Sequence, residues 1–109
     1  MKRKFPLVSI GMSVYNGEKY IRQTLNSLLN QTYKNFELII SDNASTDETK
    51  KICEEYAKRE KKIKYIRQKE NMGATYNFKF VLEQAKCEPD REIKMFIKYL
   101  LTVLICLVA

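Results

Sequence analysis

The chain of 109 residues has no histidine, no tryptophan and only three glycines, and these absences exclude whole classes of chemistry. Without histidine there is no Ser-His-Asp or Cys-His pairing, so nucleophilic catalysis by those arrangements is ruled out. No Gly-x-Gly-x-x-Gly motif follows the first apolar run, and no P-loop motif occurs anywhere in the chain. Dinucleotide-dependent oxidoreductases and P-loop NTPases are therefore disfavoured.

Cysteine is scarce as well, since Cys53, Cys87 and Cys106 are odd in number and widely spaced. They form no Cys-x-x-Cys pair and have no neighbouring ligands for zinc. We interpret them as reduced thiols of an intracellular protein, and Cys53 as a small buried hydrophobe on a helix face. No signal peptide is evident, because the basic residues 2–4 precede only a short, interrupted apolar stretch.

Acidic residues are the minority, with 13 against 20 lysines and arginines, and the formal net charge is +7. The basic residues concentrate at positions 2–4 and 58–69. Such clusters suit nucleic acid, an anionic membrane surface or a phosphorylated ligand. Basic and aromatic residues do not interleave as in a nucleic-acid platform, so we expect no nucleic-acid partner and favour solvated helix and loop faces.

What the sequence does contain is a regular alternation of apolar patterns. Apolar runs at 7–14, 36–41 and 63–67 predict three buried strands. Each run is followed by apolar residues at helical spacing, and the second helix is expected to open with a capping box at Ser45-Thr46-Asp47-Glu48. The order strand, helix, strand, helix, strand, helix predicts an α/β fold with a parallel sheet and right-handed crossovers.

Residues 88–109 depart from this regularity, because a charged turn at 88–92 leads into the largely apolar stretch 93–109. Its uninterrupted part, 99–109, is shorter than the ~20 residues of a membrane-spanning helix. With Lys94 and Lys98 able to reach an interface, residues 93–109 are a candidate for peripheral membrane contact; a buried strand or packed helix is an equally good interpretation. We therefore divide the chain into a domain at 1–87 and an atypical apolar C-terminal tail at 88–109.

Short polar side chains follow each predicted strand. They are Ser13, Tyr15 and Asn16 after the first, Asp42 and Asn43 after the second, and Asn71 after the third. Individually, Asn, Asp and Ser at such corners are more often turn residues than ligands. Because the carboxyl ends of parallel strands share one edge, the set together predicts a ligand site, where carboxylates and amides bond a base or ribose and Tyr15 flanks the base.

Several sequence blocks resemble the N-terminal part of a family 2 glycosyltransferase with the GT-A fold. They are VSIGMSVYNGE at 8–18, SLLNQTY at 27–33, IISDNASTD at 39–47, and Asn71-Met72-Gly73 followed by Asn77. The resemblance covers residues 6 to about 87 and implies a Rossmann-like three-layer parallel sheet with helices on both faces. It also implies a nucleotide-sugar donor, UDP- or dTDP-linked, whose sugar is transferred to a glycan or lipid-linked acceptor, as in cell-surface polysaccharide biosynthesis.

Carried over position by position, the resemblance gives a nucleotide-binding role to seven residues: Ser13, Tyr15, Asn16, Glu18, Asp42, Asn43 and Asn71. Within this set, Asp42 and Asn43 are expected to contact the base or ribose. Many members of the family have a second carboxylate where this chain has Asn43, so the resemblance leaves the preferred base open. Ser45 and Asp47 are assigned mainly to helix capping.

The resemblance further implies a fourth strand ending in a DxD-like acidic cluster that holds Mg²⁺ or Mn²⁺ against the diphosphate. The triplet Asp90-Arg91-Glu92 precedes the apolar stretch and is better interpreted as a solvated turn. The acceptor half and its catalytic base are missing too, so we expect no catalytic and no metal-binding residue in this chain. We predict a truncated glycosyltransferase, cytoplasmic or at the inner face of the cell membrane. The alternatives are a non-catalytic nucleotide-binding remnant and a basic membrane-surface protein.

Overall fold

The computed structural model describes residues 7–84 of the chain. Strands and helices alternate strictly along it: β1 (Val8–Val14), α1 (Ile21–Leu29), β2 (Phe36–Asp42), α2 (Thr49–Arg59), β3 (Ile63–Arg67) and α3 (Ala74–Gln84). The predicted order of elements is confirmed. The expected tail at 88–109, two of the three cysteines and the Asp90-Arg91-Glu92 triplet lie outside the described residues.

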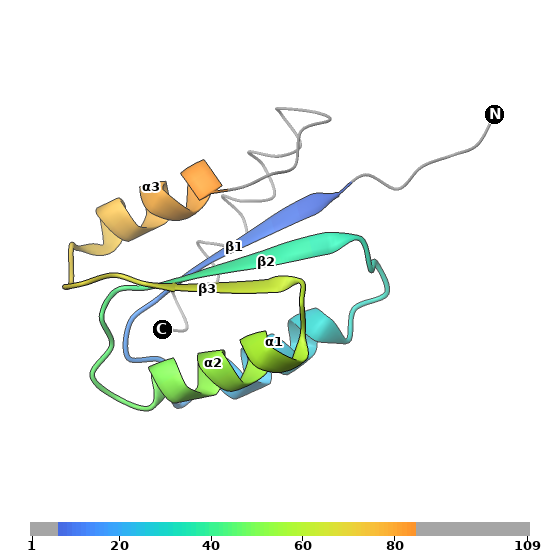
Figure 1. The fold of residues 1–109 in the computed structure, drawn as a ribbon, viewed down its shortest axis with the longest axis horizontal. Coiled ribbons are helices and arrows are strands. Elements are labelled where there is room, and N and C mark those ends of the chain that lie inside the picture. The colour runs from blue at the N-terminus through green and yellow to red at the C-terminus, as the bar shows by residue number, and fades with distance from the viewer. Residues whose placement is uncertain (1–6, 85–109) are drawn as a thin grey trace.

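The three strands form one parallel sheet in the order β1-β2-β3, as the alternation predicted. The register pairs Val14 with Asp42 and Asp42 with Arg67, so all three strands end level with one another. Helices cover both faces: α3 lies on one side of the sheet, and α1 and α2 lie together on the other (Figure 1). The carboxyl ends of the strands therefore meet at a single edge, where the next loops begin.

The apolar core lies between the sheet and the α1/α2 layer. Alternate side chains of each strand point into it, because successive residues of a strand face opposite sides. The buried residues of this core are Ile10, Met12, Val14, Ile21, Leu25, Phe36, Leu38, Ile40, Ile52, Cys53, Tyr56 and Ile63. Burial raises the pKa of the Cys53 thiol to about 12, so this cysteine is an inert core residue, as predicted.

The opposite face of the sheet, under α3, contains more small and polar residues, together with the fully buried Ile39 of β2. Ser9, Ser13 and Ser41 are buried there, with exposed fractions of 1%, 5% and 0%. In α3 itself only Asn77 and Val81 are buried. This layer is therefore held by hydrogen bonds as much as by apolar contact, and Asn77 is its central residue.

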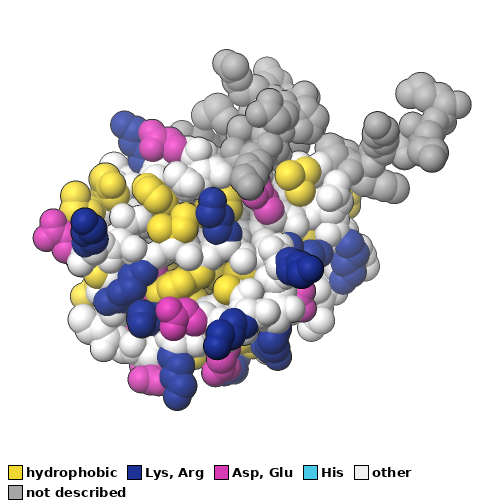
Figure 2. Space-filling model, viewed as in Figure 1, with side chains coloured by type: hydrophobic (Ala, Val, Ile, Leu, Met, Phe, Trp, Pro, Cys, Tyr) yellow, Lys and Arg dark blue, Asp and Glu magenta, His cyan; other side chains and the backbone are white. Residues whose placement is uncertain are grey.

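The charged side chains of the described surface are mixed in sign. Figure 2 shows Lys and Arg spread among Asp and Glu on the face in view. Three exposed ion pairs connect Arg22 to Glu55, Lys50 to Glu54 and Lys51 to Glu48 at 3.4, 3.8 and 3.9 Å. Within residues 7–84, no helix combines the length and the apolar composition needed to cross a lipid bilayer.

Candidate functional site

A cavity of about 300 Å³ opens at the carboxyl ends of β1 and β2, where the register brings three loops together. Its lining comes from β1 and the residue after it, from the residue after β2, from the loop before α3 and from the first turn of α3: Ser13, Val14, Tyr15, Asn43, Asn71, Ala74 and Asn77. Four of the seven predicted site residues are in this set, namely Ser13, Tyr15, Asn43 and Asn71. The topology thus gathers side chains from positions 13 to 77 of the sequence at one opening.

Tyr15 stands at the rim of this cavity with 40% of its surface exposed. It is the first residue after β1, and the next residue, Asn16, adopts the left-handed backbone conformation with φ of 49°. Asparagine tolerates that conformation better than most residues with a side chain. The turn therefore leaves an aromatic ring at the opening, available to flank a planar ligand.

Asn43 ties the end of β2 to the loop before α3. Its Nδ2 donates to Asn71 Oδ1 at 3.0 Å and to the Gly73 carbonyl at 3.1 Å, and its Oδ1 accepts from the Met72 N–H at 2.9 Å. Both amide hydrogens are thus committed to the protein, while the carbonyl oxygen keeps one acceptor position. A carboxylate here would offer no donor to the Asn71 and Gly73 oxygens, which is a physical reason for asparagine at this position.

Asn77 forms part of the cavity wall, although the sequence analysis did not assign it to the site. Its Oδ1 accepts from the Ser41 hydroxyl at 2.5 Å, and its Nδ2 donates to the Ser41 carbonyl at 2.8 Å. The side chain is only 2% exposed. The available signal was a polar residue four positions before Val81, on the face by which α3 packs against the sheet.

Asp42 does not line the cavity, and its carboxylate is completely buried at 0% exposure. Oδ1 accepts from the Ser45 N–H at 2.9 Å and from its hydroxyl at 2.6 Å. Oδ2 accepts from the Tyr65 hydroxyl at 2.5 Å and lies 3.5 Å from an Arg67 guanidinium nitrogen. Desolvation, together with the bond to Asp42, raises the pKa of Tyr65, which therefore stays a neutral donor.

Asn16 and Glu18 also lie outside the cavity lining, because they join the β1–α1 loop to the start of α2. Asn16 Oδ1 accepts from the Thr46 N–H at 2.8 Å, and Glu18 Oε1 accepts from the Glu48 N–H at 2.8 Å. In return, the Gly17 N–H donates to Thr49 Oγ1 at 2.9 Å. The two loops are therefore fixed against each other by reciprocal hydrogen bonds.

The capping box expected at residues 45–48 is wrong. Helix α2 begins only at Thr49, and the side chain of Glu48, the residue at its N-cap position, makes no capping hydrogen bond. The Ser45 hydroxyl donates to Asp42 instead, and the Glu48 carboxylate pairs with Lys51 on the surface. In a capping box Ser45 Oγ would accept from the Glu48 N–H, but Oγ accepts from the Asn16 N–H at 2.8 Å and the Glu48 N–H donates to Glu18 at 2.8 Å. Asp47 keeps part of its expected capping role by accepting from the Thr49 N–H at 2.9 Å.

The Asp47 contacts predict a pH-dependent contribution to stability. Partial desolvation raises its pKa, but hydrogen bonds from the Thr49 side chain and from the Thr49 and Glu18 N–H groups outweigh it, so the pKa falls below the ordinary 3.8. A depressed carboxyl pKa contributes stability that is present above the unfolded value and is lost as pH falls through the folded value. In urea unfolding from about pH 6 to about pH 2, the advantage of the unaltered chain over Asp47→Asn should shrink below about pH 4. Parallel profiles over that range would contradict this assignment.

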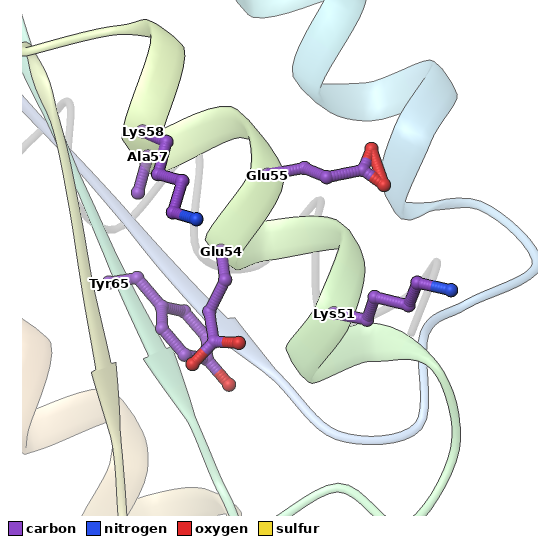
Figure 3. Close-up of a pocket in the computed structure, with 6 residues that line it drawn as sticks. All are labelled: Lys51, Glu54, Glu55, Ala57, Lys58 and Tyr65. Atoms are coloured by element: carbon purple, nitrogen blue, oxygen red, sulfur yellow. The ribbon is translucent and has the colours of Figure 1, made fainter.

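A larger cavity of about 660 Å³ lies elsewhere, between the outer face of α2 and β3. Figure 3 shows that its side chains do not converge: Glu54 lies beside the Tyr65 ring, whereas Lys51 and Glu55 point away to the other side of the helix. Glu55 bonds to Arg22 of α1, and the Tyr65 hydroxyl bonds to Asp42. Two of its polar side chains are thus committed to structural contacts, and the others do not converge on one point, so the smaller cavity is the better candidate site.

The described residues do not fit a divalent metal ion. Among residues 7–84, no three acidic, histidine or cysteine side chains are placed to hold one. Both oxygens of Asp42 are already engaged by protein groups. Within the described residues, Asp42 is therefore committed to the protein and is not available as a metal ligand.

Comparison with known proteins gives consistent results. An uncharacterized glycosyltransferase of Haemophilus influenzae is 46% identical over 68 residues, which are 62% of this chain and 21% of that protein. TuaG of Bacillus subtilis, named as a candidate teichuronic acid biosynthesis glycosyltransferase, is 38% identical over 81 residues, or 74% of this chain and 32% of that protein. The matched part thus spans about a fifth to a third of the length of these relatives.

A solved structure of residues 1–349 of S. aureus TarS in complex with UDP superimposes with a TM-score of 0.67 and 33% identity, covering 75% of this chain and 25% of that one. The parallel sheet with helices on both faces is the Rossmann-like part of the GT-A fold that such glycosyltransferases share. The family model described as glycosyl transferase family 2 matches residues 9–98. The chain therefore belongs to glycosyl transferase family 2.

Proposed function

We propose that the described domain binds the nucleoside part of a nucleotide-sugar donor in the 300 Å³ cavity at the carboxyl ends of β1 and β2. The observation that carries the proposal is the convergence of Ser13, Tyr15, Asn43 and Asn71 on one opening. Ligands of open α/β sheets bind outside the carboxyl ends of the strands, at this kind of edge. The volume lies at the lower end of the range for small-molecule sites, which suits part of a ligand rather than a whole nucleotide sugar.

The charge of the cavity decides which part of the donor it receives. None of its seven lining residues is an aspartate, glutamate, lysine or arginine: the polar groups are a serine hydroxyl, a phenol and three carboxamides. A diphosphate needs cations or a metal, whereas a base and ribose need hydrogen bonds and an aromatic surface. The lining therefore supports nucleoside recognition, with Tyr15 flanking the base and Asn43 and Asn71 bonding its polar edge.

The donor we propose is UDP- or dTDP-linked, and the acceptor a glycan or lipid-linked saccharide in cell-surface polysaccharide synthesis on the cytoplasmic side. The complex of TarS with UDP supports the first nucleotide. Asn16, Glu18 and Asp42 contribute indirectly in this proposal, since they hold the loops that carry the lining residues. In this proposal, Mg²⁺ or Mn²⁺ would be coordinated by the diphosphate oxygens of the donor and held by protein groups outside residues 7–84.

Calorimetric titration of the 109-residue chain with UDP, dTDP and GDP, with and without Mn²⁺, tests this proposal. Tyr15→Ala should weaken UDP binding by about threefold to tenfold, since an aromatic contact contributes ~0.5–1.5 kcal/mol. Tyr20→Ala is the matched control, because Tyr20 is similarly exposed at 45% and does not line the cavity. Absence of binding by all three nucleotides, or equal losses in both variants, would overturn the site assignment.

A further inference from the structure

The Ser45 hydroxyl lies between a buried carboxylate and the loop that carries Tyr15. It donates to Asp42 Oδ1 at 2.6 Å and accepts from the backbone N–H of Asn16 at 2.8 Å. Ser45 is only 3% exposed, so water does not compete freely for either bond. Neither contact belongs to helix capping, the role that local sequence suggests for this serine.

The direction of these bonds is fixed by the number of protons. A serine hydroxyl has one hydrogen, and Asp42 takes it, so the lone pairs of Ser45 Oγ are left for the Asn16 N–H. Asp42 also accepts the Ser45 N–H at 2.9 Å, which holds the serine backbone as well as its side chain. The carboxylate in turn is fixed by Tyr65 and Arg67 of β3. The chain of contacts thus runs from the edge strand, through Asp42 and Ser45, to Asn16.

The Asn16 N–H belongs to the peptide unit that joins Tyr15 to Asn16. Fixing this peptide plane fixes ψ of Tyr15, and therefore the direction in which the chain leaves β1. The side chain of Asn16 is held as well, because its Oδ1 accepts from the Thr46 N–H at 2.8 Å. The Asn43 N–H, next to Asp42, donates to the Val14 carbonyl at 2.9 Å. The two cavity residues at the strand ends are therefore set by one shared network.

We propose that Ser45, oriented by Asp42, is a positioning residue that holds Tyr15 at the cavity rim. The proposal rests on the proposed function for its effect on ligand binding, but its structural half stands without a ligand. We call the contacts from Asp42 through Ser45 to the Asn16 N–H the relay. Asp42 fixes the Ser45 hydroxyl, and Ser45 fixes the peptide group that follows Tyr15. Asp42, Ser45 and Asn16 thus act through Tyr15 and do not touch the nucleotide.

Amide hydrogen exchange on the full chain tests the structural half directly. In the unaltered chain, the Asn16 amide should exchange at least ~10-fold more slowly than an open loop amide, because its hydrogen is bonded to a buried acceptor. Ser45→Ala should remove this protection and leave the Met12 and Ile40 amides of the sheet unchanged. If the Asn16 amide of the unaltered chain exchanges like an open loop amide, the relay does not exist and the proposal falls, whatever the variants do.

UDP titration tests the functional half. Ser45→Ala should weaken binding by up to about tenfold, the effect of one lost hydrogen bond, whereas Ser45→Thr, which keeps the hydroxyl, should stay within about threefold of the unaltered chain. Ser27→Ala is the matched control, because it removes the hydroxyl of an exposed serine on α1. An unchanged Kd in Ser45→Ala would overturn the positioning role. If the unaltered chain binds no nucleotide, the proposed function and the effect of Ser45 on binding are both wrong. The hydrogen exchange rate of the Asn16 amide tests the relay independently of that result.

Discussion

Asp42→Ala is expected to lower the free energy of unfolding by about 3 kcal/mol, a large part of the 5–15 kcal/mol typical of a domain. The substitution removes the acceptor of three protein donors, the Ser45 N–H, the Ser45 hydroxyl and the Tyr65 hydroxyl. It also leaves Arg67 without its buried partner. Because the Arg67 side chain is 35% exposed, its guanidinium regains water, and most of the loss comes from the donors on Ser45 and Tyr65.

Urea unfolding followed by circular dichroism measures this loss, and Asp42→Asn separates its causes. The amide keeps one carbonyl acceptor for Ser45 but has no charge for Arg67, so about half of the destabilisation is expected. Glu70→Ala is the surface control and should lie within about 0.5 kcal/mol of the unaltered chain. If Asp42 served only as a ligand contact, Asp42→Ala would abolish nucleotide binding and keep full stability, which is the opposite pattern.

The strand pattern contained the information that separates Asp42 from Asn43. Asp42 has the same parity as Leu38 and Ile40 of β2, whose side chains face α1 and α2, so period-two alternation already directs its carboxylate to the core side. Asn43 comes one residue later, past the end of the strand, and lines the cavity. Treating Asp42 and Asn43 as one polar motif therefore gave the same role to two side chains that point in different directions.

Other features were predictable because they depend on local pattern alone. The third strand was expected at 63–67, and β3 is Ile63–Arg67. Parallel pairing of the strands followed from the alternation of strands and helices. In a parallel sheet the carboxyl ends of the strands lie at the same edge, so their meeting could be predicted too. The start of α2 was not predictable in this way, because the capping box needs Ser45 Oγ to accept from the Glu48 N–H. In the structure, Ser45 Oγ accepts from Asn16 and the Glu48 N–H donates to Glu18, and these partners lie 29 and 30 residues away in the sequence.

The contacts of Asn16 and Glu18 with the segment before α2 could not be predicted from local sequence either. Their partners, Thr46 and Glu48, lie 30 residues away in the sequence. Asparagine and glutamate at these positions are equally suited to a ligand and to free N–H groups at the start of a helix. Only the tertiary arrangement distinguishes the two uses, and within the described structure it assigns both side chains to the loop contact.

Asn77→Ala is expected to destabilise the chain by about 2–4 kcal/mol and to loosen α3 from the sheet. The side chain is 2% exposed, and its loss leaves the Ser41 hydroxyl without its acceptor and the Ser41 carbonyl without this donor. Val81 is the only other buried residue of α3, so the apolar contact that remains comes from Val81 and the partly buried Phe78, Phe80 and Leu82. Thr75→Ala, an exposed substitution in the same helix, is the matched control.

The destabilisation should be local as well as global, because α3 packs on the face of the sheet that carries Ser9, Ser13 and Ser41 and lies opposite the main apolar core. Hydrogen exchange should therefore show faster exchange of α3 amides in Asn77→Ala than of those in α2, which keeps Ile52, Cys53 and Tyr56 in the core. Nucleotide binding should fall with it, since Asn77 and Ala74 form one wall of the cavity. Uniform acceleration of exchange across all helices would instead show that α3 unfolds only together with the whole domain. In that case, the hydrogen bonds of Asn77 would be part of the global core rather than a separate attachment of the cavity wall.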